Sequence, residues 1–437
     1  MILLKSFKNI FLISELRKKL FFTLGVLIID RLGTYVPVIG VNVPLLGEYM
    51  KQATNLGSLF SYLDTFSGSA LGKCTLFSLG ISPYITASIM MQLLGMSVPA
   101  LEALMKEGEY GRKVINQYTR YLTLGLSIFY SFSYAFFLES QGLVLTPGWA
   151  FRITFVISLT AGALFVMWLG EQISLYGIGN GASMIIFAGI VARFPDYIMR
   201  TLRYIDMGTI SPITAILILV IFLAVVACVV FLEKGERKIP VQYARRIIGN
   251  KIYGGQSSYI PFKINTAGVM PVIFASSILQ IPMTVIGMLS ARYPSLKFLS
   301  EWFSIGGALF NSLEFVLIIA FTYLYTALIF NPDELAENMK KNGGFIPGIR
   351  PGKKTAEFFD YILTRIGLVG AIYLATLSIL PNILTVAINM PFYLGGTALL
   401  ICVGVALETA SQIESYLIEH RYEGFLSTGK MKGRLAR

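Results

Sequence analysis

Residues that commonly carry out chemistry are few in this sequence and lie far apart. The three cysteines stand singly in apolar stretches, and the one histidine, His420, has no neighbouring set of metal ligands. Unpaired spacing of this kind argues against a disulfide framework and against a metal centre. We therefore interpret Cys74, Cys228 and Cys402 as small residues of the core or of a lipid-facing surface.

Acidic residues inside the apolar stretches are equally sparse. Asp30, Glu314 and Glu408 form no cluster in the sequence, whereas a secondary transporter, the main competing class, usually holds ionisable groups near the middle of the membrane. Residues 177–181, GIGNG, lack the lysine and hydroxyl of a phosphate-binding loop, and we predict instead that Asn180 caps a helix there. No nucleophile, base and orienting group can be assembled, so we expect neither a catalytic site nor a cofactor, and any energy must come from a partner.

The composition is that of a membrane protein. Of 437 residues, 55% are hydrophobic and 14% are charged, and the mean hydropathy is +0.68. Soluble domains carry about a quarter charged residues, so this chain cannot cover a large water-exposed surface. Its apolar residues gather in runs of about twenty, which is the length of a helix that spans a hydrocarbon core.

Ten such runs predict an all-α polytopic membrane protein with ten transmembrane helices. The first five are expected at Leu20–Gly40, Leu76–Val98, Tyr118–Leu138, Trp149–Gly170 and Asn180–Arg193. The second five are expected at Pro212–Leu232, Ile264–Leu289, Leu309–Phe330, Arg365–Leu380 and Pro391–Gln412. The first run continues into a polar loop without a small-residue cleavage site, so we interpret it as a retained span and not as a signal peptide.

The net charge of +12 becomes informative once the basic residues are assigned to sides of the membrane. With the N-terminus placed inside, the inner segments hold most of them, as the positive-inside rule expects, which predicts cytoplasmic N and C termini. Two oppositely oriented sets of five helices then form inverted halves with a pathway between them. We divide the chain into an N-terminal half (1–194), an outer hinge loop (195–211), a C-terminal half (212–412) and a cytosolic tail (413–437).

Two inner loops of the C-terminal half, at about 233–263 and 331–365, are long and combine basic residues with Gly, Pro and apolar residues. Positive-inside topology and contact with anionic lipid head groups account for much of this charge. They do not explain the length of the loops or their turn residues. Protruding basic loops suit an anionic cytosolic partner, such as an RNA-rich particle or an acidic protein face.

Residues 56–72, LGSLFSYLDTFSGSALG, are apolar enough to avoid water and too short to span a membrane. Gly and Ser at 67–69 interrupt the segment. Broken backbone at membrane depth is tolerated only where protein or a cavity surrounds it. The segment is therefore either re-entrant and placed in a funnel, or an interfacial amphipathic helix, and composition alone slightly favours the second interpretation.

Long strings of this sequence resemble the SecY family of protein-conducting channels. They include RLGTYVPVIGV beginning at Arg31, FSGSALGKCTLFSLGISPYITASIMMQLL at 66–94, KEGEYGRKVINQYTRY at 106–121 and MWLGEQISLYGIGNGASMIIFAGIVA at 167–192. In the second half they are RKIPVQYARR, NTAGVMPVIFASSIL, NPDELAENMKKNGGFIPGIRPGKKT and GGTALLI. The strings keep their order across almost the entire chain. One departure is Leu175-Tyr176, where the family commonly has a charged pair, and it puts in doubt any polar contact assigned to that loop.

The resemblance implies the channel of the Sec translocon, which passes unfolded secretory proteins across the membrane and releases membrane-protein segments sideways into lipid. The family channel is an hourglass closed by a ring of aliphatic side chains, and the matching positions are Ile81, Ile85, Ile186, Ile273 and Ile401. A narrow apolar ring dewets and blocks ions, and it can deform around a passing chain. A plug at about 59–72 would fill the outer funnel, and its matching residues are Phe60, Leu63, Phe66, Ser67, Gly68 and Leu71.

The spans that carry Ile85 and Ile273 match the lateral gate of the family. The polar residues on or near these helices are Ser88, Gln92, Ser276 and Ser277. Their alternative role is ordinary interhelical hydrogen bonding, worth about 0.6 kcal/mol each on average. Prolines in the same spans are expected to remove backbone hydrogen bonds locally and to permit bending; they are Pro83, Pro271 and Pro282.

The remaining expectations concern the roles of charged residues. Arg31, beside Asp30, is costly in lipid if unpaired, so we expect it to face the bundle and brace it. Arg245, Arg246 and Arg350 match family positions that face the ribosome or the SecA motor, and lipid head-group contact remains the alternative for Lys353 and Lys354.

The resemblance also implies partners and a location. The partners are small SecE-like and SecG-like membrane subunits, the SecA motor ATPase, the ribosome, unfolded preproteins with their signal sequences, and anionic lipids. The location is the bacterial cytoplasmic (inner) membrane, as a multi-pass protein. The chain itself would be a channel subunit and not an enzyme.

Overall fold

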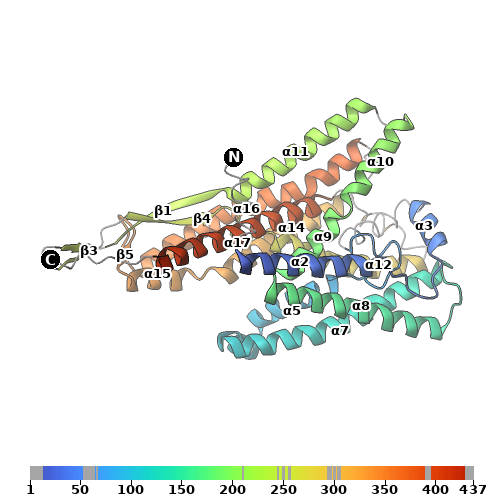
Figure 1. The fold of residues 1–437 in the computed structure, drawn as a ribbon, viewed down its shortest axis with the longest axis horizontal. Coiled ribbons are helices and arrows are strands. Elements are labelled where there is room, and N and C mark those ends of the chain that lie inside the picture. The colour runs from blue at the N-terminus through green and yellow to red at the C-terminus, as the bar shows by residue number, and fades with distance from the viewer. Residues whose placement is uncertain are drawn as a thin grey trace. The chain divides into compact units, whose positions relative to one another are not determined.

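A computed structural model of the chain describes residues 13–52, 64, 67–208, 211–243, 246–248, 251–253, 257–292, 298, 302, 307–388 and 395–428. Most elements are helices (Figure 1). In chain order they are α2 (Ser14–Gly33), α3 (Val43–Gln52), α5 (Ser82–Ser97), α6 (Pro99–Lys106), α7 (Glu109–Ser140), α8 (Trp149–Tyr176), α9 (Gly181–Val191), α10 (Phe194–Asp206), α11 (Pro212–Lys234), α12 (Met270–Arg292), α14 (Ala308–Ile329), α15 (Pro332–Lys341), α16 (Lys353–Ile388) and α17 (Gly396–Thr428). The strands are β1 (Glu236–Tyr243), β2 (Arg246–Ile248), β3 (Lys251–Tyr253), β4 (Ser257–Lys263) and β5 (Gly344–Phe345).

Within the described part of the chain, 7 helical stretches are long and apolar enough to cross a membrane, and the count rises to 8 with the pair Ser82–Ser97 and Pro99–Met105, which is bent by 106°. The 7 are Glu109–Ser140, Trp149–Tyr176, Gly181–Asp206, Pro212–Lys234, Ala308–Lys341, Lys353–Pro381 and Gly396–Glu419. α2 and α12 occupy the positions of the first and seventh predicted spans. The helices are consistent with ten spans, and the prediction of a largely α-helical multi-pass membrane protein is confirmed.

The chain forms two compact units, and each is described by itself. Unit 1 contains residues 1–47, 64–192 and 405–437, and unit 2 contains residues 48–63 and 193–404. The end of α17 belongs to unit 1 because the Lys19 Nζ donates a hydrogen bond to the Tyr416 hydroxyl at 2.9 Å, and the Thr409 hydroxyl lies 3.5 Å from the Met184 sulfur. The division of the sequence into two halves at 195–211 stays a prediction.

Close packing in unit 1 depends on small residues at helix contacts. α7 packs against α5 and α8, and α8 packs against α9. A Cβ on Gly162 of α8 would overlap the carbonyl oxygen of Leu76, and a Cβ on Gly181 would overlap the carbonyl oxygen of Gly170. Small residues of this kind let membrane helices approach closely and gain van der Waals contact.

The GIGNG sequence begins a helix, as predicted. The Asn180 Oδ1 accepts hydrogen bonds from the amides of Ala182 at 3.0 Å and Ser183 at 3.3 Å, and it thereby caps α9. The amide of Ile178 donates to the Thr23 hydroxyl at 3.1 Å, which joins the same turn to α2. The turn is therefore a structural junction between α2, α8 and α9.

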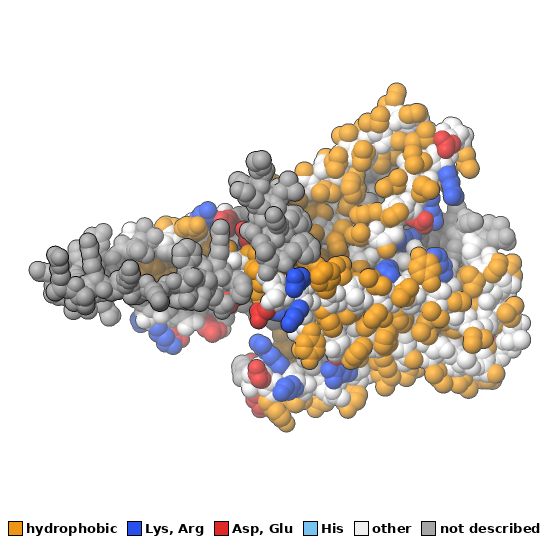
Figure 2. All heavy atoms as spheres, viewed as in Figure 1, with side chains coloured by type: hydrophobic (Ala, Val, Ile, Leu, Met, Phe, Trp, Pro, Cys, Tyr) orange, Lys and Arg blue, Asp and Glu red, His pale blue; other side chains and the backbone are white. Residues whose placement is uncertain are grey.

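Residues 195–211 were expected to form a loop, and the structure places most of them in α10, which runs from Phe194 to Asp206. The charges of α10, at Asp196, Arg200, Arg203 and Asp206, recur every three or four residues, as in an amphipathic helix, so it has no long apolar run that hydropathy would mark as a span. The next helix, α11, is apolar along most of its length. Figure 2 shows hydrophobic side chains covering the visible surface of α11, as expected for a helix in contact with lipid.

The prolines do not all act as expected. Pro83 and Pro271 lie in the first turns of α5 and α12, where the amide that proline lacks would have no helical partner. These two residues therefore start helices and do not bend them. Pro282 lies inside α12, and it is the one of the three at which a backbone hydrogen bond is removed within a span.

The two long inner loops contain ordered structure in unit 2. β1 pairs with β4 in antiparallel register, with Ile239 opposite Ile260, and β1 also pairs with β5 through Gln242 and Phe345. The resulting three-stranded sheet has the order β4-β1-β5, and β2 and β3 form a separate pair. The segment 331–365 contributes α15, β5 and the first turns of α16.

Candidate functional site

The three predicted ring residues of unit 1 are buried. Ile81 is the residue before α5, Ile85 lies one turn later, and Ile186 lies on α9; their exposed fractions are 2%, 8% and 2%. Ile81 contacts α8, because a Cβ on Gly170 would lie 2.9 Å from the Ile81 Cδ1 and 3.5 Å from the Ile185 Cδ1. Unit 1 thus brings the start of α5 and the side chains of α9 to one region of α8.

The two predicted ring residues of unit 2 are also buried. Ile273 on α12 is 3% exposed, and Ile401 on α17 is 0% exposed. A Cβ on Gly404 would overlap the Val269 side chain, so α17 contacts the residues just before α12. Ile401 and Ile273 each lie about one helical turn along the chain from that contact.

The start of α12 is fixed by an asparagine. The side-chain amide of Asn265 donates to the Glu233 Oε1 at 2.6 Å and to the Gly268 carbonyl at 3.0 Å. The Ile264 amide donates to the Gly235 carbonyl at 2.9 Å. These bonds tie the turn that precedes Ile273 to the end of α11 and position α12.

Of the predicted plug residues, Ser67, Gly68 and Leu71 are described, whereas Phe60, Leu63 and Phe66 lie outside the described residues. We call residues 67–74 the plug stem. Its backbone is tightly wound: Gly68, Ser69 and Cys74 have positive φ angles of 64°, 71° and 47°. The stem is a folded turn and not a continuous helix, so the prediction of an interrupted segment is supported.

Asp64 organises the plug stem from its N-terminal side. Its Oδ1 accepts a hydrogen bond from the Gly72 amide at 2.9 Å, and its carbonyl accepts from the Ser69 amide at 3.1 Å. The Ser67 hydroxyl in turn accepts from the Leu71 amide at 3.2 Å. Three backbone donors of the turn are thus satisfied by Asp64 and Ser67, as burial of a turn favours.

Arg31 and Asp30 form an ion pair beside the stem. The Arg31 Nη2 lies 2.6 Å from the Asp30 Oδ2, and Asp30 is buried. A Cβ on Gly68 would overlap the Arg31 Nη1 and would lie 3.0 Å from the Gly189 Cα. Arg31 therefore braces the interior of unit 1, as expected, and it also contacts the plug stem.

Three of the four predicted gate residues, Ser88, Gln92 and Ser276, form hydrogen bonds within their own helices. On α5 the Gln92 side-chain amide donates to the Ser88 hydroxyl at 3.4 Å. On α12 the Ser276 hydroxyl donates to the Ile273 carbonyl at 2.9 Å, and both Ser276 and Ser277 are buried. Buried hydroxyls in membrane helices commonly bond to a carbonyl of the preceding turn, as the Ser276 hydroxyl does here.

The two inner loops share one hydrophobic core in unit 2. We call this arrangement the cytosolic platform, after the side of the membrane that the sequence predicts for these loops. Its buried residues come from β1, β4, α15, the segment after β5 and α16, and they are Ile239, Val241, Phe262, Ala336, Met339, Ile346, Ala356, Phe359, Ile362 and Leu363. Because β1 alternates buried and exposed side chains, its outer positions remain available to solvent.

The outside of the cytosolic platform carries charges of both signs, with a small excess of cations among the described residues. Its exposed cations are Arg237, Lys238, Lys263, Lys340, Lys341, Arg350, Lys353 and Lys354. Several are paired with acids: Lys238 with Glu236 at 3.2 Å, and Lys341 with Glu337 at 3.1 Å. The hydrogen bond to Glu236 raises the pKa of Lys238.

Arg350 is exposed and, among the described residues, takes part in no ion pair. Its carbonyl accepts a hydrogen bond from the Thr355 hydroxyl at 3.0 Å, which fixes the backbone of the turn. Of the other two predicted contact residues, Arg246 begins β2 and Arg245 lies outside the described residues.

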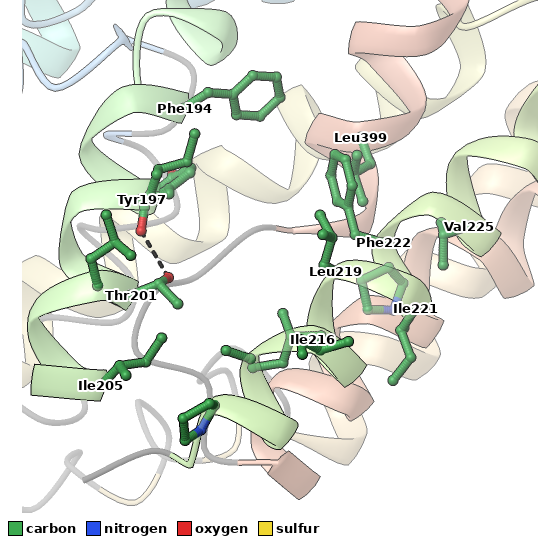
Figure 3. A pocket seen from close by; sticks show the side chains of 16 residues that line it. Phe194, Tyr197, Thr201, Ile205, Ile216, Leu219, Ile221, Phe222, Val225 and Leu399 are labelled. Carbon is green, nitrogen blue, oxygen red and sulfur yellow. Dashed lines mark hydrogen bonds between the residues drawn. The ribbon is translucent and has the colours of Figure 1, made fainter. Parts of the chain in front are cut away.

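A cavity of about 590 Å³ lies between α10 and α11 in unit 2. Its lining is almost entirely aliphatic and aromatic, with Phe194, Leu219 and Phe222 pointing toward it (Figure 3). The Thr201 hydroxyl in its wall donates to the Tyr197 carbonyl at 2.9 Å. The cavity offers no charged group to an ion or polar solute, so it does not resemble a transporter site. No group of three His, Cys, Asp or Glu side chains within the described ranges is placed to hold a metal ion.

Sequence reasoning missed two polar contacts that hold these elements. The Tyr134 hydroxyl on α7 donates to the Leu71 carbonyl of the plug stem at 2.9 Å, and the Ser378 hydroxyl on α16 donates to the Glu314 Oε1 on α14 at 2.8 Å. The partners are 63 and 64 residues apart. Glu314 was visible as an acid within an apolar run, but nothing in the sequence indicated a role for Tyr134.

The fold and these elements define a class of protein, a multi-pass membrane channel. Two solved structures have this fold. A SecY structure in which the plug domain stabilises the closed state of the translocation channel and maintains a membrane seal matches with a TM-score of 0.65 and 19% identity, over 93% of this chain and 94% of the other. Sec61 in the canine ribosome–channel complex from the endoplasmic reticulum matches with a TM-score of 0.62 and 19% identity, over 93% and 94% of the two chains.

Sequence comparison identifies the family. The SecY family model matches residues 75–410. The protein translocase subunit SecY of Aquifex aeolicus is 43% identical over 426 residues, which cover 96% of this chain and 98% of that protein. The chain belongs to the SecY family, and its fold is that of a protein-conducting channel.

Proposed function

We propose that this chain forms the protein-conducting channel of a Sec translocon, which passes unfolded secretory proteins across the membrane and releases membrane-protein segments sideways into lipid. The observation that carries the proposal is the 43% identity to a protein translocase subunit along 96% of the chain. The burial of the five isoleucines, the turn of the plug stem and the exposed cations of the cytosolic platform support the proposal.

The ring of isoleucines is proposed to be the barrier. Ile81, Ile85 and Ile186 from unit 1 would meet Ile273 and Ile401 from unit 2 around a narrow passage. An apolar constriction blocks ions because a dehydrated ion finds no polar partners there. Aliphatic side chains also lack fixed hydrogen bonds, so the ring can widen around an unfolded polypeptide and close again.

The plug and the gate are proposed to control opening. In the SecY structure described above the plug maintains a membrane seal, and the segment at about 59–72 would do so here. α5 and α12 would part to form the lateral gate. The hydrogen bonds of Ser88, Gln92 and Ser276 lie within their own helices. They support this role, because a bond within one helix does not resist the separation of α5 from α12 by a hydrophobic signal sequence.

The cytosolic platform is proposed to receive the partner that drives transport. The chain has no catalytic site of its own on this proposal, so energy comes from a SecA-like ATPase or from the ribosome. An exposed cluster of cations on a folded platform attracts RNA or an acidic protein face, and Arg350, Arg245 and Arg246 are the proposed contact residues. Small SecE-like and SecG-like subunits and anionic lipids would complete the complex in a bacterial cytoplasmic membrane.

Ion conductance of the resting channel tests the proposal. Replacing Ile81, Ile186 and Ile401 together by serine is expected to raise the conductance of purified channels in planar bilayers, because hydroxyls let water and ions enter the constriction. Ile153 and Ile157 on α8 are exposed, and their replacement by serine is the matched control. Unchanged conductance in the triple variant would remove these isoleucines from the barrier.

A further inference from the structure

Tyr134 of α7 contacts the plug stem, although it lies outside the sequence strings that carry the family resemblance. Its hydroxyl donates to the Leu71 carbonyl at 2.9 Å, and the ring lies 5.7 Å, centroid to centroid, from the ring of Phe155 on α8. Phe155 is fully buried and Tyr134 is 6% exposed. The tyrosine is thus held rigidly by the α7–α8 pair while its polar end reaches the stem.

The bond lies at the centre of the stem. The Leu71 carbonyl also accepts from the Cys74 amide at 3.0 Å, and the Cys74 side chain contacts the Tyr134 hydroxyl. Beyond this point the chain is fixed to the segment after α2, because the Val38 amide donates to the Cys74 carbonyl at 3.0 Å. Tyr134 therefore bonds to the stem close to the point where its turn joins the chain that is fixed by Val38.

The other hydrogen bonds described for the stem run within its turn or to neighbouring loop segments; for example, the hydroxyls of Thr75 and Ser78 donate to the Ala70 carbonyl. Asp64, Ser67 and Gly72 bond within the turn itself, so these bonds can move with it as a unit. Gly68 contacts Arg31 and Gly189 by packing. The hydrogen bond from Tyr134 is directional and joins the turn to a transmembrane helix, so it opposes displacement of the turn.

We propose that Tyr134 is a positioning residue that holds the plug stem in the closed channel. The inference rests on the proposed function, in which the segment at about 59–72 is the plug. When the stem is displaced, the Tyr134 hydroxyl loses its acceptor, so the bond favours the closed arrangement. An average interhelical hydrogen bond in a membrane is worth about 0.6 kcal/mol, or about threefold in the population of the displaced stem.

The test compares two tyrosines of one helix. Tyr134→Phe removes the hydroxyl that bonds to Leu71, and Tyr130→Phe removes a buried hydroxyl one turn away, which lies beside Thr86 of α5 and not at the stem. Both variants keep the ring and its packing. They are made in the full chain, purified with its partner subunits, in a background in which Cys228 and Cys402 are replaced by alanine.

Cys74 is the reporter because it lies in the stem and is fully buried. The rate of its modification by N-ethylmaleimide is expected to rise about threefold in Tyr134→Phe and to stay unchanged in Tyr130→Phe. An equal rate in Tyr134→Phe and the unsubstituted protein would overturn the proposal, as would equal increases in both variants.

A measurement of resting ion flux distinguishes the role of Tyr134 from the proposed role of the plug as a seal. Faster modification together with a raised resting ion flux supports both the role of Tyr134 and the role of the plug as a seal. Faster modification with unchanged flux supports the role of Tyr134 in holding the stem and contradicts the sealing role of the segment. A raised flux without faster modification would contradict the inference, because the leak would not arise from the stem.

Discussion

The Ser378 hydroxyl on α16 donates a hydrogen bond of 2.8 Å to the Glu314 Oε1 on α14, and both residues are fully buried. α14 packs against α16 within unit 2, so the bond joins two neighbouring membrane helices. The second carboxyl oxygen of Glu314 has no hydrogen-bond partner among the described residues. An acid at this depth is costly unless it is partnered, and Ser378 supplies one partner.

Glu314 is expected to tolerate glutamine better than leucine. Glu314→Gln keeps an oxygen that can accept from Ser378, whereas Glu314→Leu removes the acceptor and leaves the Ser378 hydroxyl without it. The leucine variant is expected to lose about 0.6 kcal/mol of stability relative to the glutamine variant, measured as the melting temperature in mild detergent. In a Ser378→Ala background the difference between the two should vanish; a persistent difference would show that the bond does not couple them.

Arg350→Glu is expected to impair export driven by the motor and to leave membrane insertion of the channel intact. The residue is exposed, and the turn around it is held by its carbonyl and Thr355, so the charge can be reversed without loss of the fold. The measurement is the rate of preprotein transport into vesicles. Lys341→Glu is the control, because Lys341 is equally exposed but already paired with Glu337. Equal losses in both variants would indicate a general effect of basic charge, and normal transport by Arg350→Glu would contradict its assigned role.

Asn180→Ala is expected to lower the free energy of unfolding by about 1 kcal/mol, because the α9 amides of Ala182 and Ser183 lose their cap. Asn338→Ala, at an exposed position inside α15, is the comparison and should change stability by less than about 0.5 kcal/mol. Denaturant unfolding in detergent measures both. A similar small effect at the two sites would mean that the cap contributes little to this helix.

Gly162→Ala is expected to destabilise unit 1 by about 1–3 kcal/mol, because its Cβ would overlap the backbone carbonyl of Leu76, which cannot rotate away. A Cβ on Gly125 of α7 would meet no atom within 4 Å, and alanine there favours the helix by up to about 1 kcal/mol. The two alanine variants should therefore shift the melting temperature in opposite directions. A stable Gly162→Ala variant would show that α8 can move away from the α5 connection.

The sequence by itself determined the class of the protein and the places of most spans. An apolar run of about twenty residues is stable in a membrane as a helix. Lipid forms no hydrogen bonds with backbone N–H and C=O groups, and a helix pairs these groups within itself. Local sequence also predicted that Asn180 caps a helix. It failed at α10, where charges divide the apolar residues, and at Pro83 and Pro271, whose effect depends on their position within the helix.

The tertiary structure alone decided which polar groups meet. Tyr134 and Leu71 are 63 residues apart, and Glu314 and Ser378 are 64 residues apart. Hydropathy is a property of single residues. A hydrogen bond between two helices forms only if both helices have the right rotation about their axes and the right depth in the membrane. Those are set by the packing of a whole unit, including contacts as specific as Gly162 against Leu76. For that reason the apolar spans could be predicted from the sequence, whereas the hydrogen bond from Tyr134 to the plug stem could not.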